Sequence, residues 1–389
     1  MENGMRFLTA GESHGKALVG IIEGLPSGLE ITSEQIHAEL KRRKMGYGRG
    51  SRQKIESDQL EILTGIRHGK SLGSPITLMI KNQDFKNWGE IMQSEPDPSN
   101  PDARKVDIPR PGHADLIGGV KYHFSDMRNV LERASARETA MRVGLGTIAR
   151  IFLDSFGIEV SSRVVGIGSA VDAAPMPSDL TDLNKTTDAS PVRCLDKNSE
   201  KEMIAEIDSA RDNGDSVGGT FEVYASGVPH SLGSYVHWDR RIEAKVGSHF
   251  LSLNAIKGVE IGLGSKSAIL PGSQVHDEMK LSDSGEVEFC TNKTGGIIGG
   301  MTSGDPIVIR AFMKPIATLM TPLGSVDLSN RSNAKAHVER SDYCAVPAAA
   351  VIGESLLCFI LAESILEKFG GDSMEEIKSR IDSWKERSL

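Results

Sequence analysis

The sequence predicts an α+β protein, a single large layered unit in which helices pack against antiparallel or mixed sheets. Strand-like and helix-like segments alternate along the 389 residues without the regular period of a Rossmann fold or a barrel. No internal repeat, low-complexity tract or linker divides the chain, so we expect residues 1–389 to form one domain. The 41 glycines exceed the roughly 7% of average usage and predict many tight turns between these segments.

Short apolar runs predict the first two strands, at residues 6–10 and 18–22, on either side of a glycine-rich turn. Thr32 or Ser33 can cap the helix that follows, because a hydroxyl oxygen can accept a hydrogen bond from a free amide of the first turn. The same patterns then predict strands at 62–64 and 76–80, a polar surface loop at 94–105, a long helix at 129–156 and a strand at 160–167.

The second half begins with a polar stretch at residues 172–198, which contains three prolines and no clear period, so we expect a loop that tolerates sequence change. Residues 345–366 form the most apolar stretch. Glu354 and Glu363 interrupt it, so it lacks the ~20 clean apolar residues of a membrane span and predicts a buried core helix. The other elements expected here are a helix at 205–212, a strand at 220–225, a helix at 240–255, strands at 259–261 and 307–313, and two closing helices.

The composition argues against several classes of function. A formal net charge of -8 disfavours a general nucleic-acid binder, since such proteins usually carry a net basic field. The four cysteines are widely scattered and lack metal-ligand spacing, so we expect reduced thiols and no metal site. The first residues lack the basic and apolar regions of a secretory signal. We therefore expect a cytoplasmic protein with no membrane or nucleic-acid partner.

Two glycine-rich segments match nucleotide-binding motifs only in part. Residues 65–71 have three residues between their glycines where a P-loop has four, and a turn and a strand follow where a helix is needed. Residues 262–264 lack the third glycine of the dinucleotide fingerprint. We reject the first motif and give the second little weight.

Basic residues gather in several short segments of this acidic chain. Residues 41–54 contain no acidic residue, and their interleaved glycines would let a loop wrap around an anion. Taken alone, this segment leaves a solvated basic loop or a nucleic-acid patch open. Arg110 and His113 lie in a second basic segment, and Arg133 and Arg137 would share one face of the long predicted helix. Several such clusters together indicate a small, multiply charged anion.

His14 and His113 are the best candidates for acid-base chemistry. Imidazole has an ordinary pKa of about 6.5, which suits proton transfer at neutral pH. Both residues lie in exposed glycine-rich segments where a ligand can reach the ring, whereas His37, His230 and His276 are expected to be structural. The residues thus predict an enzyme that acts on a small phosphorylated anion, with His14 in its active site.

Three segments, in order along the chain, resemble those of the chorismate synthases. Residues 11–15 read Gly-Glu-Ser-His-Gly and are followed by an apolar strand and Glu-Gly-Leu-Pro at 23–26. Residues 135–142 read Ser-Ala-Arg-Glu-Thr-Ala-Met-Arg, and Arg-Ser-Asp at 340–342 precedes Gly-Glu-Ser at 353–355. With Arg-Pro-Gly-His-Ala-Asp at 110–115 and Asn-Ala at 254–255, the resemblance covers nearly the whole chain. It departs at Tyr343, where the family usually has a small residue or proline, and at Ala134, where serine is frequent.

The resemblance implies the chorismate synthase fold and the conversion of 5-enolpyruvylshikimate 3-phosphate to chorismate by 1,4-anti elimination of phosphate. This reaction is the last common step toward the aromatic amino acids. The resemblance also implies reduced FMN as a cofactor that is not consumed, leaves NADPH open as an indirect reductant, and implies a homotetramer. A substrate with one phosphate and two carboxylates, together with the FMN phosphate, would account for several basic clusters.

Carried over to this sequence, the resemblance implies three groups of site residues. The catalytic residues would be His14, His113 and Asp342. The substrate would be bound by Arg43, Arg49, Arg52 and Arg137, of which the family also assigns the first two to NADP. The cofactor contacts would be Arg43, Arg49, Arg133, Ala134, Ser135, Asn254, Ala255, Gly299, Lys314, Pro315, Ile316, Ala317, Thr318 and Arg340.

The implied catalytic roles divide the elimination between three side chains. His113 would protonate or polarise the departing phosphate, because an imidazolium stabilises negative charge that develops there. His14 would hydrogen-bond to, or protonate, the anionic reduced flavin. Asp342 would help remove the C6 proton, with flavin N5 as a relay left open.

Two other functions stay open on the sequence alone. A flavin reductase, or another flavoprotein with net redox chemistry, would consume NADPH without releasing an elimination product. An RNA-binding protein would use residues 41–54, although the net charge and the lack of interleaved aromatic residues count against it.

Overall fold

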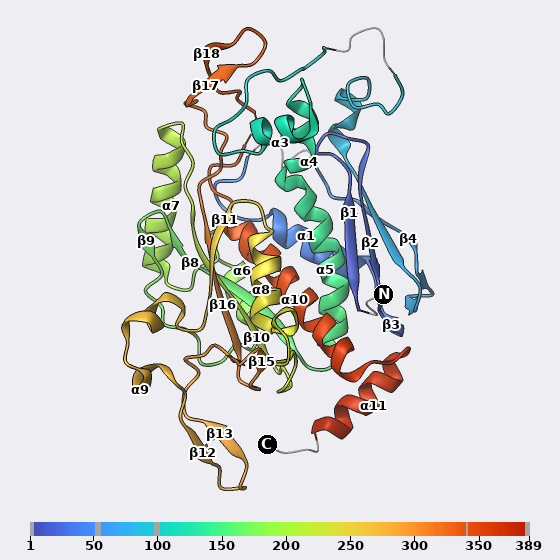
Figure 1. Ribbon diagram of the computed structural model, residues 1–389, viewed down its shortest axis with the longest axis vertical. Helices are drawn as coiled ribbons and strands as arrows, with labels where there is room; N and C mark the ends of the chain where they lie inside the picture. The colour runs from blue at the N-terminus through green and yellow to red at the C-terminus, as the bar shows by residue number, and fades with distance from the viewer. Residues whose placement is uncertain (1–3, 51–55, 97–101, 340, 386–389) are drawn as a thin grey trace.

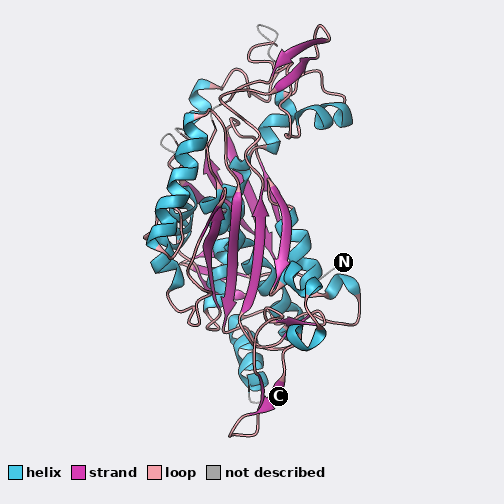
Figure 2. Ribbon diagram, turned by 90° about the vertical axis from the view of Figure 1, so that its left-hand side faces the viewer, coloured by secondary structure: helices cyan, strands magenta, loops and turns pink. Residues whose placement is uncertain are grey.

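The computed structural model describes residues 4–50, 56–96, 102–339 and 341–385, and its core is a layer of helices between two sheets (Figure 1). The first sheet has four strands in the order β1-β2-β7-β4, and the second has five in the order β11-β16-β10-β8-β9. Figure 2 shows the longer strands running along the long axis of the molecule. This arrangement confirms the predicted α+β fold with helices packed against antiparallel sheets.

The first sheet consists of β1 (Arg6–Ala10), β2 (Ala17–Glu23), β7 (Ile76–Lys81) and β4 (Leu60–Thr64). Ile76, Leu78 and Ile80 alternate along β7 and are fully buried, because every second side chain of a strand faces the helices. Gly20 of β2 allows a close approach: a Cβ there would lie 2.5 Å from the Cγ of Met141. All the strands predicted for this region are present.

The helical layer contains α1 (Ser33–Lys44), α5 (Thr139–Asp154), α8 (Ile242–Leu251) and α10 (Val346–Phe369). Thr32 caps α1, because its side chain accepts from the Gln35 amide while the Gln35 side chain accepts from the Thr32 amide. α5 packs on β2 and β7 of the first sheet, and α10 packs on β8 and β10 of the second. α10 is long and apolar enough to cross a membrane, but 89% of its most apolar 18-residue window is buried within the protein, as expected for a core helix.

The second sheet consists of β11 (Ile256–Ile261), β16 (Ile307–Met313), β10 (Gly219–Ser226), β8 (Glu159–Ile167) and β9 (Ala170–Val171). Its predicted strands are confirmed. The smaller strands are β3 (Ser27–Glu30), β5 (Ile66–Arg67), β6 (Lys70–Leu72), β12 (Met279–Leu281), β13 (Val287–Phe289), β14 (Ile297–Ile298), β15 (Met301–Thr302), β17 (Gly324–Asp327) and β18 (Ser332–Lys335). The remaining α-helices are α3 (Asp115–Tyr122), α4 (Arg128–Ala134), α6 (Leu183–Asp188), α7 (Lys197–Asp212), α9 (Gly272–Val275) and α11 (Met374–Lys385). Short 3-10 helices cover Gln83–Asn87, Ala136–Glu138, Trp238–Arg240 and Gly264–Ile269.

The prediction of one long helix at 129–156 is wrong, because the helix is interrupted at Ser135 and residues on either side form α4 and α5. Ser135 is extended (φ -66°, ψ 141°), and its hydroxyl accepts from the Arg137 amide, which starts a new turn. The Ser13 hydroxyl also donates to Ser135 across 3.0 Å. Arg133 and Arg137 therefore do not share one helix face.

Three smaller predictions are also corrected by the structure. The helix expected at 240–255 is only α8, since Ala255 has a left-handed φ of 67°. The helix expected at 205–212 begins earlier, at Lys197, where the Asp196 side chain accepts from two amides of the first turn. The stretch 172–198 is not a plain loop: it contains α6 and buries Arg193.

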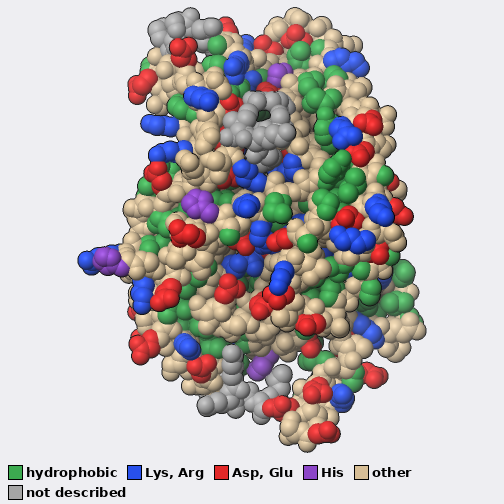
Figure 3. All heavy atoms as spheres, turned by 180° about the vertical axis from the view of Figure 1, so that it is seen from behind, with side chains coloured by type: hydrophobic (Ala, Val, Ile, Leu, Met, Phe, Trp, Pro, Cys, Tyr) green, Lys and Arg blue, Asp and Glu red, His purple; other side chains and the backbone are tan. Residues whose placement is uncertain are grey.

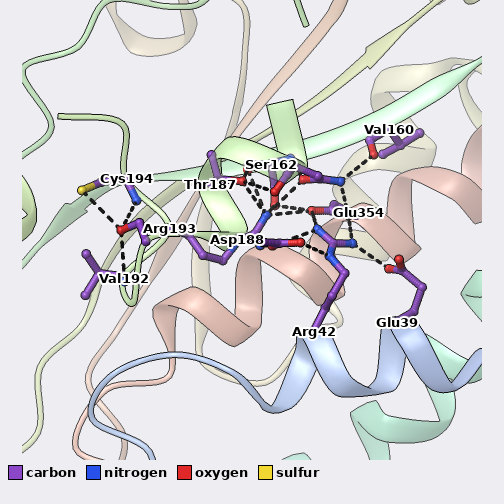
Figure 4. Close-up of polar contacts among 12 residues, drawn as sticks. Glu39, Arg42, Val160, Ser162, Thr187, Asp188, Val192, Arg193, Cys194 and Glu354 are labelled. Carbon is purple, nitrogen blue, oxygen red and sulfur yellow. Dashed lines mark hydrogen bonds and ion pairs between the residues drawn. The ribbon is translucent and has the colours of Figure 1, made fainter. Parts of the chain in front are cut away.

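A buried ion cluster explains why part of that polar stretch lies inside the protein (Figure 4). Glu354 of α10 is fully buried and accepts from Arg42 of α1 (2.8 Å), Arg150 of α5 and Arg193 (3.2 Å). Buried charges are stable only when they are paired and hydrogen-bonded. The cluster therefore holds α1 and α5 against α10, since each helix supplies one member of these ion pairs.

Candidate active site

A cavity of ≈ 440 Å³ is lined by residues of the helices α1, α4, α5 and α10, of the strands β11 and β16, and of several loops. All three predicted catalytic residues line it, together with three of the predicted substrate-binding arginines: His14, His113, Asp342, Arg43, Arg49 and Arg137. Most of the predicted cofactor contacts line it as well: Ala134, Ser135, Asn254, Ala255, Lys314, Ile316, Ala317 and Thr318. Folding thus brings together segments that are up to several hundred positions apart in sequence.

Several predicted residues do not line this cavity. Arg133 is exposed and donates to the carbonyl oxygens of Thr9 (2.9 Å) and Gly11 (3.3 Å). Gly299 lies in the turn between β14 and β15, and Pro315 is absent from the cavity wall. Arg52 and Arg340 lie outside the described residues.

Arg43 and Arg49 present buried donors to the cavity. The Nε and Nη2 atoms of Arg43 donate to Thr139 (3.1 and 3.0 Å), and burial lowers its pKa to about 10. Within the described chain, Arg43 Nη1 and Arg49 Nε are buried without a hydrogen-bond acceptor, and Arg43 Nη1 lies 3.8 Å from the Asp58 carboxylate. Since a buried N–H without an acceptor costs free energy, Arg49 Nε is the atom that fits an anionic ligand.

Asp342 is held by the same arginine segment that was expected to bind anions. Its Oδ2 atom lies 2.8 Å from Arg49 Nη1, and its Oδ1 atom accepts from the Gly50 amide (2.6 Å). Tyr343, the departure from the family pattern, donates its amide to the Gly48 carbonyl (2.8 Å). These contacts fix the Asp342 carboxylate and the chain that follows it.

His14 is buried, which corrects the expectation of an exposed glycine turn. Its ring stacks on Trp88, with centroids 4.0 Å apart and planes 20° apart, and its Nδ1 atom lies 2.9 Å from Glu132 Oε1. Burial alone would raise the pKa of Glu132, but the hydrogen bonds from His14 and the charge of Arg128 outweigh it and lower that pKa. His14 therefore faces a charged carboxylate.

His113 is paired with a carboxylate in a similar way. Its Nδ1 atom lies 2.6 Å from Asp115 Oδ1, and Asp115 Oδ2 accepts from Arg110 Nε (2.9 Å). Burial would raise the pKa of Asp115, but the hydrogen bonds from His113 and Arg110 hold it well below its usual range. Arg110 also donates to Thr318 (2.9 Å) and so ties this pair to the loop that contains Lys314.

The described part of the basic segment, residues 41–50, does not form one surface, because adjacent helical residues point about 100° apart. Arg43 turns to the cavity, whereas Arg42 turns to the buried Glu354 cluster. Figure 3 shows Lys and Arg side chains gathered near the middle of one face, among scattered Asp and Glu side chains. The positive charge is therefore concentrated in one region of a protein whose net charge is negative.

Sequence reasoning missed several residues of the site. Asp115 and Glu132 are the partners of the two histidines. Asp115 ends the motif at 110–115 and Glu132 lies just before the one at 135–142, but the sequence does not show what they contact. Trp88 and Lys257 also contribute to the site without a sequence signal. Conversely, Gly-Glu-Ser at 353–355, part of the third family motif, lies in the core: a Cβ on Gly353 would lie 2.8 Å from Phe221.

The described residues contain no group of three or more His, Cys, Asp or Glu side chains that could hold a metal ion. The titratable groups at the cavity are instead arranged as imidazole–carboxylate pairs and arginines. The α+β fold and this lining define an enzyme that binds a small, multiply charged anion and can move protons beside it.

The comparisons with known proteins name the family. Residues 5–366 match the family model described as chorismate synthase. The chain is 50% identical to the chorismate synthase of Listeria welshimeri over 97% of this chain and 98% of that protein, and 50% identical to that of Desulforamulus reducens over 98% of each. A solved structure titled "Crystal Structure of Chorismate Synthase" is 40% identical, with a TM-score of 0.78 over 98% of this chain and 97% of that one. The chain belongs to the chorismate synthase family and is a carbon–oxygen lyase that acts on phosphates.

Proposed function

We propose that this enzyme converts 5-enolpyruvylshikimate 3-phosphate to chorismate and phosphate by 1,4-anti elimination, in the presence of reduced FMN. In this reaction the C3–O bond to phosphate breaks and the C6 proton leaves. The observation that carries the proposal is the convergence, in one cavity, of two histidine–carboxylate pairs with Arg43 and Arg49, of which Arg49 offers a buried donor without an acceptor. A phosphate and two carboxylates on one small substrate suit such a lining.

The lining of the cavity supports the proposed residue roles. Arg43, Arg49 and Arg137 all line it and would hold the anionic groups of the substrate. His113, supported by Asp115 and Arg110, donates a proton or a hydrogen bond to the departing phosphate. Asp342 helps to remove the C6 proton once the substrate displaces its contact with Arg49.

The residues near Lys314 fit the phosphate-bearing cofactor. Lys257 and Lys314 both line the cavity. Burial, followed by the charge of Lys257, lowers the pKa of Lys314. The Lys314 amide donates to the Ala255 carbonyl (3.0 Å), and Asn254 donates to the Ala134 carbonyl (3.0 Å), so the predicted flavin segments are in contact.

When bound, reduced FMN supplies electron density transiently to the allylic system of the substrate. Ala134, Ser135, Asn254, Ala255 and the segment 314–318 would hold the cofactor, and His14 would hydrogen-bond to its anionic reduced form. The Ala134 departure is compatible with this, since its carbonyl already serves Asn254. Arg133, Gly299, Pro315 and Arg340 stay predictions as cofactor contacts.

An anaerobic assay with the enolpyruvyl substrate tests the proposal. We expect equal amounts of chorismate and phosphate with chemically reduced FMN and neither product without it. A second reaction with oxidised FMN and NADPH shows whether NADPH can act as the reductant. Product formation without reduced flavin would overturn the cofactor requirement, and NADPH consumption without an elimination product would favour a flavin reductase.

We also propose a homotetramer. The outer face of the first sheet exposes Leu8 (67%), Leu63 (49%) and Ile21 (38%), and Leu8 lies directly opposite Ile21, so this face offers apolar side chains to another subunit. We expect the wild type to sediment at four times 42.0 kDa and Leu8→Glu to sediment at a lower mass. Val171→Glu is the matched control, because Val171 is also 67% exposed but lies on β9 of the other sheet. A wild-type monomer, or a Leu8→Glu tetramer, would contradict this interface.

Residues 1–389 are proposed to form one domain, and the enzyme is proposed to work in the cytoplasm on small molecules, without a nucleic-acid or membrane partner. The contacts of α10 with α1, α5, α8, β8 and β10 support the first point. The free cysteines support a reducing compartment, since Cys194, Cys344 and Cys358 are buried thiols.

A further inference from the structure

We propose that Glu132 is a positioning residue that holds His14 in one ring orientation and in one tautomer, with the proton on Nδ1 and with Nε2 left for a ligand. The tautomer and orientation follow from the contacts alone. Their consequence for catalysis rests on the proposed function, in which His14 is the partner of the reduced cofactor.

Glu132 forms hydrogen bonds to the turn that contains His14 through both its side chain and its backbone. Its Oε2 atom accepts from the His14 amide (2.7 Å), and its Oε1 atom lies 2.9 Å from His14 Nδ1. The Glu132 carbonyl accepts from the Ser13 amide (2.9 Å). A carboxylate in this position fixes the side chain and the chain that carries it.

The contacts also select the protonation site of the ring. Arg128 Nη1 donates to Glu132 Oε1 (3.1 Å), and the pKa of Glu132 is lowered, so this carboxylate is ionised at neutral pH and can only accept hydrogen bonds. The His14 nitrogen that faces it, Nδ1, must therefore carry a proton. In the described chain, Nε2 makes no hydrogen bond to another residue, and His14 lines the cavity.

Two further residues support this arrangement: Trp88 fixes the plane of the His14 ring, and Arg128 keeps Glu132 ionised. Trp88 stacks on His14, and the guanidinium of Arg104 lies 4.0 Å from the Trp88 ring centroid. Arg128 contacts Glu339 (3.4 Å) as well as Glu132, and the hydrogen bond from His337 helps to lower the pKa of Glu339 to about 2. The His14 ring thus has little freedom to rotate or to exchange its tautomer.

This arrangement suits a ring that must receive and return one proton. When Nε2 takes up a proton, the adjacent Glu132 carboxylate offsets the positive charge of the imidazolium, and Nε2–H can donate to an anion. Without the carboxylate, the neutral ring can carry its proton on Nε2 and leave Nδ1 as the acceptor, on the side away from the ligand.

Glu132→Gln tests the inference, because glutamine has nearly the same size but replaces one acceptor with a donor. The first readout is the pair of ¹⁵N shifts of the His14 ring, in cofactor-free, histidine-labelled protein at a pH where imidazole is ordinarily neutral, assigned with His14→Asn. We expect the Nδ1–H tautomer in the wild type and a shift toward Nε2–H in Glu132→Gln. The second readout is turnover: we expect kcat to fall roughly 100-fold, with KM for the substrate changed little.

Glu222→Gln is the matched control, since Glu222 is also buried and bonded to arginines (Arg163 and Arg310) but does not line the cavity. It should keep the wild-type tautomer and nearly wild-type kcat. Glu132→Asp keeps the charge, and we expect it to restore the Nδ1–H tautomer and part of the lost turnover.

A wild-type Nε2–H tautomer, or an unchanged tautomer in Glu132→Gln, would overturn the positioning role even if the enzyme forms chorismate. The expected tautomers in a protein that forms no chorismate would instead refute the proposed function and leave the positioning role intact. If Glu132→Gln does not fold, the wild-type and Glu132→Asp spectra still decide the question.

Discussion

His113→Ala should lower kcat by about 100-fold or more at saturating substrate and saturating reduced FMN. The reason is geometric: Asp115, itself held by Arg110, positions the imidazole at the cavity wall, where it can donate to the departing phosphate. Removal of the ring leaves the developing charge on the phosphate without this donor. The measurement is anaerobic turnover, with release of chorismate and phosphate followed separately.

Folding must be shown to be intact in the variant. His113 is partly exposed, with 20% of its side chain accessible, so the thermal unfolding of His113→Ala should stay close to that of the wild type. His276→Ala serves as the control, because His276 is exposed and does not line the cavity. Full turnover by His113→Ala would rule out its proposed role in phosphate departure.

Glu354→Gln should destabilise the protein by about 3–5 kcal/mol at neutral pH. The substitution keeps the shape of the side chain but leaves Arg42, Arg150 and Arg193 around a neutral group in the core. Equilibrium unfolding in urea measures the loss. Glu367→Gln on the same helix is the control, because its ion pair with Lys245 (2.7 Å) is partly exposed and should contribute less than about 1 kcal/mol.

The difference between wild type and Glu354→Gln should depend on pH. Burial would raise the pKa of Glu354, but the charges of Arg42, Arg150 and Arg193 outweigh it and lower the pKa below its ordinary value of 4.5. A lowered carboxyl pKa stabilises the folded state above the unfolded value, and this stabilisation is lost as the pH falls through the folded value. We therefore expect a full difference above about pH 5 that shrinks toward lower pH. An equal difference at every pH would contradict the ion cluster.

The elements that could be predicted are those whose cause is local. The strand β7 follows from alternating Ile76, Leu78 and Ile80, and the start of α1 follows from Thr32 three residues before Gln35. The break at Ser135 could not be predicted, because apolar residues continue at helical spacing across it. The contact that supports it comes from Ser13, which is 122 positions away in sequence.

In the site, too, some features could be predicted from local sequence and others depend on distant contacts. The residue types in the basic and glycine-rich segments predicted a polyanion ligand and the two histidines, and the family motifs then implied the roles of these residues. They did not show that Arg42 and Arg43 serve different purposes, or that Gly-Glu-Ser at 353–355 supports the core and not the cavity. Adjacent residues of a helix share the same local sequence, but their side chains point about 100° apart and so meet different parts of the protein.

The sequence by itself determined the α+β class, most strands, the cap of α1, and the set of charged and histidine side chains available for chemistry. These depend on interactions within a few residues. Only the tertiary structure decided which carboxylate each histidine meets, that His14 is buried against Trp88, and that the polar residues near Arg193 belong to the core. The pairing of Glu132 with His14 spans 118 positions, and such contacts depend on how the layers pack rather than on the pattern of either segment.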